Sequence, residues 1–118
     1  MAYADGFVIV VQKKNVGAYK RVSKKAGKIW REHGCLDYKE CVGDDLKARF
    51  GVSFLKLAKT KPNETVVFSW IVYRSRAHRD KVNAKVMADP RMAKMMNAPM
   101  PFDMKRFSYG GFKVIVDA

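Results

Sequence analysis

The two histidines are the side chains best suited to acid–base chemistry near neutral pH. His33 falls near the end of a predicted helix, on its apolar side, and His78 falls in the first turn of a second one. His33 is a candidate acid or base facing a cleft, with a core or helix-capping role as the alternative; His78 is expected at the surface. Asp5, Glu40 and Asp103 have no recognisable partner, so no carboxylate pair is assigned.

No motif for metal binding or nucleophilic catalysis is present. Two histidines without a third ligand do not make a zinc site, and the chain has no Ser–His–Asp spacing, phosphate loop or GxGxxG segment. Cys35 and Cys41 would lie roughly 20 Å apart along one strand, too far for a disulfide. We therefore expect no metal, no cofactor, and two free thiols that are buried or half-buried.

Four aromatic side chains from predicted strands could line a ligand cavity and orient a ligand through a hydroxyl group or an indole N–H. The alternative is a place in the core or at a subunit interface, which is the commoner role of aromatic residues in sheets. Together with His33, the candidate ligand-binding residues are Tyr38, Trp70, Tyr73 and Tyr109.

Six of the seven methionines crowd into one part of the chain. Thioethers bind copper(I), so a soft-metal site is one interpretation. Flexible packing or an adaptable contact surface is the more ordinary one, and we favour it. The six are Met87, Met92, Met95, Met96, Met100 and Met104.

The net charge of +13, from 24 basic and 11 acidic residues, favours an anionic partner. One arc of the first predicted helix is almost entirely basic, and a second basic cluster follows between 74 and 85. No RNA-binding signature accompanies them, so we favour a solvated face and keep a nucleic-acid-associated binding protein as the alternative function. The candidate anion-binding residues are Lys20, Arg21, Lys24, Lys25, Lys28 and Arg31.

Hydrophobic patterns predict four strands and two main helices. The first and third strands, Gly6–Val11 and Thr65–Tyr73, are apolar on both faces, whereas Leu36–Val42 alternates as edge strands do. In the last strand, Arg106–Val116, a Gly-Gly pair indicates a bulge or a close backbone approach.

The helices are predicted between these strands. Val16–His33 has an apolar arc of about 140°, with Asn15 as its N-cap. Ser75 caps a second helix, Arg76–Ala88. Pro90 opens a short further turn of helix, and the stretch from 43 to 64 is expected to be a loop with a short strand or helix.

The element order β-α-β, loop, β-α-β predicts an α+β fold, a ferredoxin-like βαββαβ sandwich. The whole chain, 1–118, is expected to form one such domain. In this arrangement the first and third strands are central and the other two lie at the edges, which agrees with their patterns.

Both helices of this fold cover the same face of the sheet, so the other face is left apolar. It would expose either the residues 66, 68, 70 and 72 or the residues 67, 71 and 73. Each large apolar side chain left in water loses ~1.5–3 kcal/mol of burial free energy. Such a patch exceeds what monomers show. We therefore predict a homodimer through facing sheets, with the loop 43–58 folding back over the face as the alternative.

No apolar run is long enough for a signal sequence or a membrane span, and we expect a cytoplasmic protein with no membrane partner.

Five short motifs are specific in combination. They are DGF at 5–7, YKEC at 38–41, VVFSW at 66–70, DPRM at 89–92 and MPFDMKRFSYGGF at 100–112. Together they resemble the YbaA-like bacterial family, domain of unknown function 1428, across nearly the whole chain. Where the family's loop reads FDGKR, Met104 replaces the glycine.

The resemblance implies a dimeric α/β barrel, in which two ferredoxin-like protomers face each other through their sheets. Wider structural relatives include cofactor-free oxygenases, decyclising enzymes and stress proteins that bind ligands between sheet and helices. The resemblance therefore implies a small-ligand site in that cleft and leaves open whether the protein is an enzyme.

Overall fold

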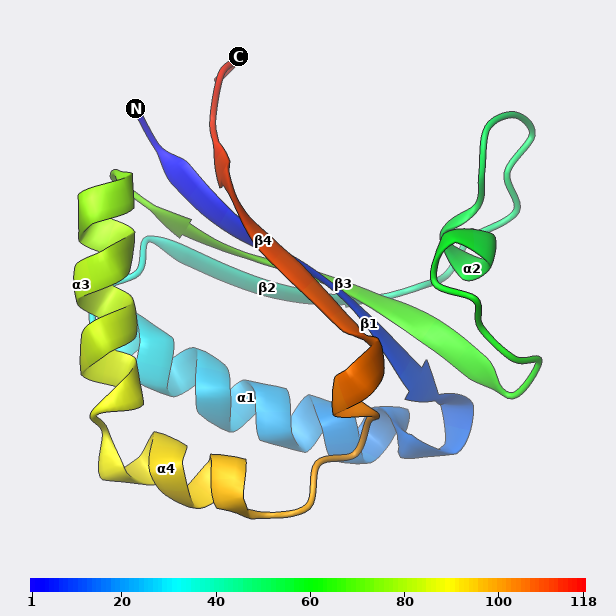
Figure 1. The fold of residues 1–118 in the computed structure, drawn as a ribbon, viewed down its shortest axis with the longest axis horizontal. Coiled ribbons are helices and arrows are strands. Elements are labelled where there is room, and N and C mark those ends of the chain that lie inside the picture. The colour runs from blue at the N-terminus through cyan, green and yellow to red at the C-terminus, as the bar shows by residue number, and fades with distance from the viewer.

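A four-stranded antiparallel sheet forms the centre of the computed structural model, which describes residues 1–118 (Figure 1). The strand order is β2-β3-β1-β4, so the two apolar strands are central, as predicted. This confirms the α+β, ferredoxin-like class. The strands are β1 (Tyr3–Gln12), β2 (Asp37–Val42), β3 (Glu64–Tyr73) and β4 (Phe107–Lys113).

Helices α1 (Val16–Glu32), α3 (Arg76–Met87) and α4 (Pro90–Asn97) lie together on one face of the sheet (Figure 1). None of the helices has the length and the hydropathy that a membrane crossing requires. α3 begins as predicted, because the Ser75 hydroxyl accepts a hydrogen bond from the His78 N–H at 3.1 Å.

Asn15 occupies the predicted N-cap position of α1, but it does not act as a side-chain cap. Its side chain makes no capping hydrogen bond. The short 3₁₀ helix η1 (Lys13–Asn15) leads directly into α1, and the Val16 N–H donates to the Lys13 carbonyl instead. A backbone turn thus replaces the expected side-chain cap.

The Gly-Gly pair of β4 is a close approach and not a bulge. The register with β1 continues unbroken through Gly110 and Gly111. A Cβ on Gly111 would collide with the side chains of Tyr3 and Arg79. The predicted strand 106–116 also ends earlier, at Lys113.

The core lies between the sheet and the helices. Ile71 and Tyr73 of β3 pack against Val82 and Val86 of α3, and Ile9 and Val67 pack nearer the start of α1. Because side chains alternate along a strand, these contacts fix which residues of β3 face away from the helices.

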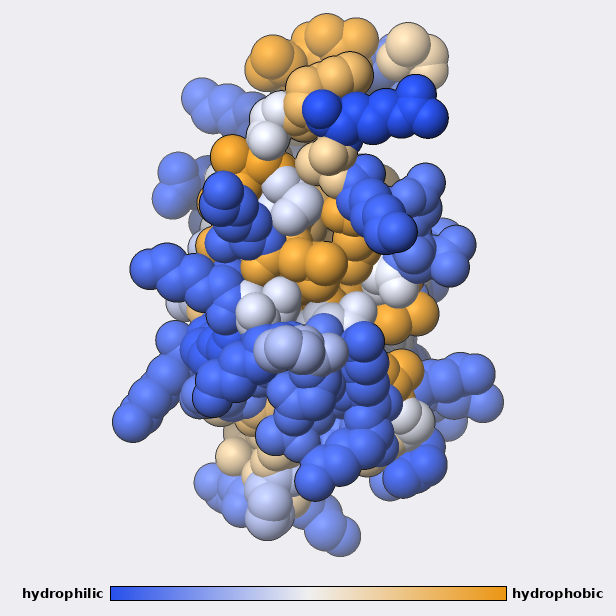
Figure 2. Space-filling model, turned by 90° about the vertical axis from the view of Figure 1, so that its right-hand side faces the viewer, coloured by the Kyte–Doolittle hydropathy of each residue, from blue (hydrophilic) through white to orange (hydrophobic).

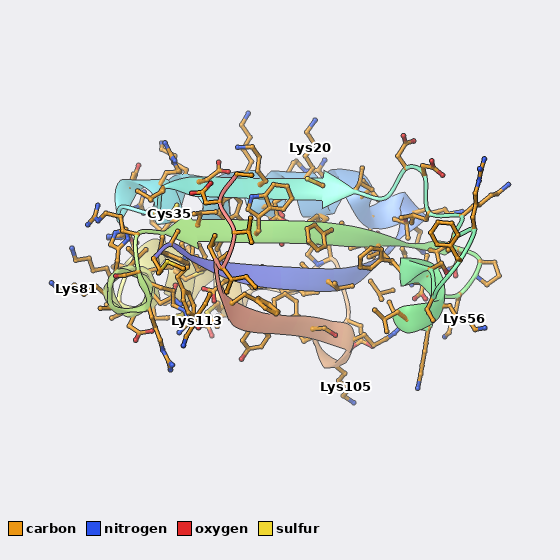
Figure 3. All side chains as sticks on the ribbon, turned by 90° about the horizontal axis from the view of Figure 1, so that it is seen from above. Lys20, Cys35, Lys56, Lys81, Lys105 and Lys113 are labelled. Carbon is orange, nitrogen blue, oxygen red and sulfur yellow. The ribbon has the colours of Figure 1, made fainter.

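The opposite face of the sheet is open over most of its length. It carries Val66, Phe68, Trp70 and Val72 of β3, the first of the two predicted alternatives. Phe68 is 42% exposed, and Phe112 of β4 is 60% exposed. Figure 3 looks onto this face, with β2 and β4 at its two edges.

Helix α2 (Phe54–Leu57) covers one end of the open face (Figures 1 and 3). The Phe54 and Phe68 rings lie 6.0 Å apart. The predicted covering loop is therefore present at that end only. Figure 2 shows hydrophobic side chains on this end of the molecule, above hydrophilic ones in its lower part. Phe50 and Val52, which precede α2, and Leu57 of α2 are exposed.

The two cysteines are separate. Cys35 is buried, as expected, but Cys41 is exposed. Cys41 pairs with Phe68 in the sheet register, so it lies on the open face of an edge strand. The expectation that both thiols are at least half-buried is therefore wrong for Cys41.

Candidate ligand-binding site

A cavity of about 610 Å³ lies between the covered face of the sheet and helices α1, α3 and α4. Phe7, Ser69 and Tyr109 come from neighbouring strands in one row of the sheet register. Ala26 and Trp30 of α1 lie on the helical side. Cavities that bind small molecules usually have volumes of roughly 300–1,000 Å³ and mostly apolar walls, and this one matches both criteria.

All six clustered methionines line the cavity. They come from the end of α3, from α4 and from the segment that leads to β4. Met92 is buried, whereas Met87, Met96 and Met104 are exposed, so the cavity opens to solvent beside α4 and β4. Unbranched thioether side chains give a wall that adapts to the shape of an apolar ligand. No group of three or more His, Cys, Asp or Glu side chains is placed to hold a metal ion.

Aromatic rings form a continuous apolar surface in the cavity. The Phe7 and Tyr109 rings stack at 6.2 Å, and the Phe102 and Phe107 rings stack at 5.8 Å. Tyr19 of α1 meets Phe102 edge-on at 5.7 Å. Stacked and edge-on rings offer flat contacts to an aromatic or alkyl group.

An ion pair between a buried carboxylate and a half-buried guanidinium supplies one polar point of the cavity. The Asp5 carboxylate accepts a hydrogen bond from Arg79 Nε at 3.1 Å, and Asp5 is only 6% exposed. The Arg79 guanidinium also bonds Asp80 at 2.8 Å and lies 5.0 Å from the centre of the Tyr3 ring. Pairing of this kind is what a buried carboxylate requires.

Asn83 supplies a second polar point. Its Oδ1 accepts hydrogen bonds from Trp30 Nε1 at 3.3 Å and from the Tyr73 hydroxyl at 3.2 Å. Burial raises the pKa of Tyr73, so its hydroxyl remains a donor. The NH₂ group of Asn83 takes no part in these two hydrogen bonds.

Glu40 of β2 forms the third polar point. The hydroxyl groups of Tyr19 and Tyr38 each donate to this carboxylate at 2.7 Å. Burial and then the neighbouring Glu40 charge raise the pKa of both tyrosines, which keeps the hydroxyls protonated. The Tyr38 ring lies against Gly27 of α1, where a Cβ would come within 2.9 Å of the ring.

A basic groove of about 620 Å³ runs between α1 and the edge strand β2. Lys20, Lys24, Lys28 and Arg31 line it, whereas Arg21 and Lys25, also predicted as anion-binding, lie outside its lining. Figure 3 places Lys20 at the outer edge of the sheet, beside β2. The groove and the cavity share four residues: Tyr19, Ser23, Tyr38 and Glu40.

Of the five residues predicted to bind a ligand, Tyr38 and Tyr109 line the cavity. Tyr73 is fully buried behind Asn83, and Trp70 lies on the open face. His33 lies at the end of α1, where its Nε2 is 2.8 Å from Asp89 Oδ2.

His78 is half-buried, and burial followed by the charge of Arg74 lowers its pKa. Its Nδ1 accepts a hydrogen bond from the Arg74 N–H at 3.0 Å, which requires an unprotonated nitrogen.

Sequence reasoning missed the polar residues of the cavity. Asp5 and Glu40 do have partners, contrary to expectation. The predicted first strand, Gly6–Val11, leaves Asp5 out, whereas β1 includes it. Two signals in the sequence point to these residues. Alternation in β2 puts Glu40 on the same face as Tyr38. The i, i+4 spacing of Arg79 and Asn83 puts these two residues on one side of α3.

Comparison with known proteins identifies relatives of this chain. A family model described as a protein of unknown function, DUF1428, matches residues 2–104. The uncharacterised protein YbaA of Escherichia coli K12 is 44% identical over 117 residues, which cover 99% of both chains.

Solved structures share the fold at low sequence identity. Rv0793 from Mycobacterium tuberculosis matches with a TM-score of 0.62 at 13% identity, over 100% of this chain and 99% of its own. SnoaB, a cofactor-independent oxygenase from Streptomyces nogalater, matches with a TM-score of 0.63 at 11% identity, over 98% of this chain and 95% of its own.

A dimeric ferredoxin-like protein from an uncultured marine organism matches with a TM-score of 0.60 at 11% identity, over the full length of both chains. These three likenesses concern the fold alone. The family match and the full-length identity to YbaA go further, and they show that the chain belongs to the YbaA-like DUF1428 family.

Proposed function

We propose that this protein binds a small, largely apolar molecule in the cavity between its sheet and its helices. The observation that carries the proposal is a hollow of about 610 Å³ whose walls are methionines and aromatic rings, interrupted by three polar points. A core that served stability alone would be close-packed, with few voids larger than a water molecule.

The test is titration with Nile red, a neutral apolar dye that fluoresces when it leaves water. We expect saturable binding by the native protein. Ala26→Phe places a ring in the cavity and should weaken binding at least tenfold. The matched control, Ala84→Phe, makes the same change on the exposed side of α3 and should bind as the native protein does. Equal binding by Ala26→Phe and the native protein would contradict the cavity as the site.

We further propose that the protein is a homodimer joined through the open face of the sheet. The exposed rings of Phe68 and Phe112 support this, as does the tail after β4, where Ile115 and Val116 are exposed. The tail leaves the sheet on the side opposite α1 and α4 (Figure 1). One protein of the same fold is described as dimeric.

Sedimentation equilibrium tests the dimer. We expect a particle of twice the chain mass of 13.5 kDa, and we expect Phe68→Glu to dissociate it because a charge would replace buried apolar surface. Leu36→Asp, an exposed apolar position off this face, should leave the mass unchanged. A native protein that sediments as a monomer at micromolar concentration would contradict the proposal.

The alternative function is a nucleic-acid-associated protein, and the basic groove supports it. Phosphate binding by Lys20, Lys24, Lys28 and Arg31 would be weak and would fall steeply with salt. Titration against RNA and duplex DNA at two salt concentrations tests this alternative. Failure to bind either at ~50 mM salt would remove it.

A further inference from the structure

The acceptor groups at the three polar points of the cavity are already engaged. The Asp5 carboxylate accepts a hydrogen bond from Arg79, and the Glu40 carboxylate accepts one from each of two tyrosine hydroxyls. The amide oxygen of Asn83 accepts one from an indole N–H and one from a tyrosine hydroxyl. These acceptors are therefore occupied by groups of the protein itself.

Ser69 adds a polar group that has no partner in the protein. Its side chain lines the cavity from the central strand β3, and the residue is only 4% exposed. No side-chain hydrogen bond includes Ser69, although every fully enclosed polar side-chain atom of the protein has a partner. The Ser69 hydroxyl therefore borders the space of the cavity, where it can donate to a ligand.

Asn83 presents a second donor, from the helical side of the cavity. An indole N–H only donates, so the hydrogen bond from Trp30 at 3.3 Å places the amide oxygen of Asn83 on the Trp30 side. The NH₂ group of this amide lies on the other side and only donates. Ser69 and Asn83 therefore both favour a ligand that supplies an acceptor oxygen.

The charged side chains of the cavity wall favour an uncharged ligand. Two of them are acidic, Asp5 and Glu40, and two are basic, Lys39 and Arg79. Both basic side chains are paired with carboxylates. An anion that entered the cavity would lose its hydration without meeting an unpaired cation, and this loss is costly.

The sheet side of the cavity favours a flat molecule. Ser69, Phe7 and Tyr109 lie in one row on three neighbouring strands. Adjacent strands are about 4.8 Å apart, so Ser69 and Tyr109 are separated by roughly 10 Å. The Phe7 and Tyr109 rings stack at 6.2 Å and offer an aromatic surface beside the Ser69 hydroxyl. A two-ring aromatic molecule can lie along this row with an oxygen at Ser69.

We infer that the ligand of this protein is an uncharged aromatic molecule with a carbonyl-type oxygen, and that the Ser69 hydroxyl donates a hydrogen bond to this oxygen. The inference rests on the proposed ligand-binding function and adds the chemical class of the ligand. The rings of the ligand lie against Phe7, Tyr109 and the methionines, and its oxygen lies over the central strands.

Three naphthalenes that differ in one group test the inference. 2-Acetylnaphthalene carries a carbonyl oxygen, 2-ethylnaphthalene has a methylene group in its place, and 2-naphthoate is ionised at neutral pH. Their affinities are measured by displacement of Nile red, after the affinity of the dye itself is measured for each variant. We expect 2-naphthoate to bind at least tenfold more weakly than 2-acetylnaphthalene.

Ser69→Ala removes the hydroxyl and leaves the cavity otherwise unchanged. We expect this variant to bind 2-acetylnaphthalene about threefold to tenfold more weakly than the native protein, which is the effect of one neutral hydrogen bond. Binding of 2-ethylnaphthalene should not weaken, and it shows that the variant folds with its cavity intact. The matched control is Ser108→Ala, at an exposed position paired with Val8 on the other face of the sheet. It should bind all three probes as the native protein does.

The outcomes separate this inference from the proposed function. Unchanged binding of the ketone by Ser69→Ala, or an equal loss for the ketone and the hydrocarbon, would overturn the inference while the cavity remained a binding site. So would binding of 2-naphthoate as tight as that of the ketone, or failure of both neutral naphthalenes when Nile red binds. Failure of Nile red and all three naphthalenes would overturn both. A loss confined to the ketone and to Ser69→Ala supports the inference.

Discussion

Arg79 joins helix α3 to the sheet through its contacts with Asp5 and the Tyr3 ring. It bonds the buried Asp5 and the exposed Asp80, and it lies over the Tyr3 ring. Gly111 leaves the space that Arg79 and Tyr3 occupy. A planar guanidinium can form several directed hydrogen bonds and stack on a ring at the same time, which a lysine ammonium cannot.

Arg79→Met should lower the free energy of unfolding by about 3 kcal/mol, because it leaves the buried Asp5 carboxylate without a counter-charge. Adding Asp5→Asn to this variant should recover part of the loss, since the unpaired charge is then gone. Urea denaturation measures both. Arg76→Met, at an exposed position of the same helix, should change the value by no more than about 0.5 kcal/mol. A double variant less stable than Arg79→Met alone would contradict this account.

Helix α1 approaches the sheet closely because it carries small residues where Tyr38 crosses it. Gly27 contacts the Tyr38 ring, and this contact positions the hydroxyl that donates to Glu40. A Cβ on Gly17, in the first turn of the same helix, would meet only the flexible end of Arg21, at an ordinary contact distance of 3.8 Å. The two glycines therefore differ in what an added methyl group would do.

Gly27→Ala should destabilise the protein by roughly 1–3 kcal/mol, as overpacking does, although alanine is the better helix former. Gly17→Ala should stabilise it by up to about 1 kcal/mol through helix propensity. Thermal and urea unfolding give both values. Stabilisation of the same size in both variants would show that the Tyr38 ring moves aside without cost.

The junction of α1 and α4 is held by a charged cluster around Asp89. Hydrogen bonds from Arg91 and then from His33 hold the pKa of Asp89 well below its ordinary value. Arg91 also reaches Glu32 at the end of α1, at 2.6 Å. The lowered pKa means that the folded protein favours the charged carboxylate more strongly than the unfolded chain does.

The stabilising contribution of Asp89 should be complete above the ordinary pKa of aspartate, about 3.9, and should be lost as the pH falls through the lower native pKa. Asp89 is also the N-cap of α4, where its side chain accepts a hydrogen bond from the Arg91 N–H. Asp89→Asn keeps a good N-cap residue but cannot ionise. The difference in unfolding free energy between native protein and Asp89→Asn should therefore be larger at pH 6 than at pH 3. Asp117→Asn, in the exposed tail, should show no such dependence. A pH-independent difference would exclude this role of the carboxylate.

The molecule as a whole carries a net charge of +13 on 118 residues. Like charges repel in the compact state, and salt screens this repulsion. Four of the basic residues are gathered in one groove, so part of the repulsion is local.

Raising sodium chloride from ~20 to ~200 mM should raise Tm, because the Debye length shortens to less than about 10 Å. The rise should be smaller for the variant with Lys24→Gln and Lys28→Gln, in which the groove has lost two charges. Differential scanning calorimetry at fixed protein concentration measures both. A Tm that falls with salt would mean that attractive ion pairs outweigh the repulsion.

The architecture was predictable because its signals are local. Two strands apolar on both faces, one alternating strand and a strongly amphipathic helix suffice to order the sheet. Alternation also places Trp70 and Tyr73 on opposite faces of β3, so both cannot meet one ligand. Which of them faces the helices depends on packing, which the local pattern does not contain.

The cavity was not predictable, because its walls come from distant parts of the chain. Asp5 lies in β1 although aspartate is disfavoured in strands, because its carboxylate accepts a hydrogen bond from Arg79. Arg79 is 74 residues away in sequence, so the local pattern does not show this contact. The sequence shows the methionines as a cluster, but only the packing of α3, α4 and the segment before β4 brings them around one hollow. A local hydrophobic pattern does not indicate contacts between residues so far apart in the sequence.

Placing six methionines around one hollow has a spectroscopic consequence. In protein carrying ¹³C-labelled methionine methyl groups, an NMR spectrum would contain six resonances from the walls of the cavity. The seventh, from the exposed Met1, would serve as an internal reference. Any molecule entering the hollow would shift several of the six and leave the seventh in place, so the chain contains its own reporters of occupancy.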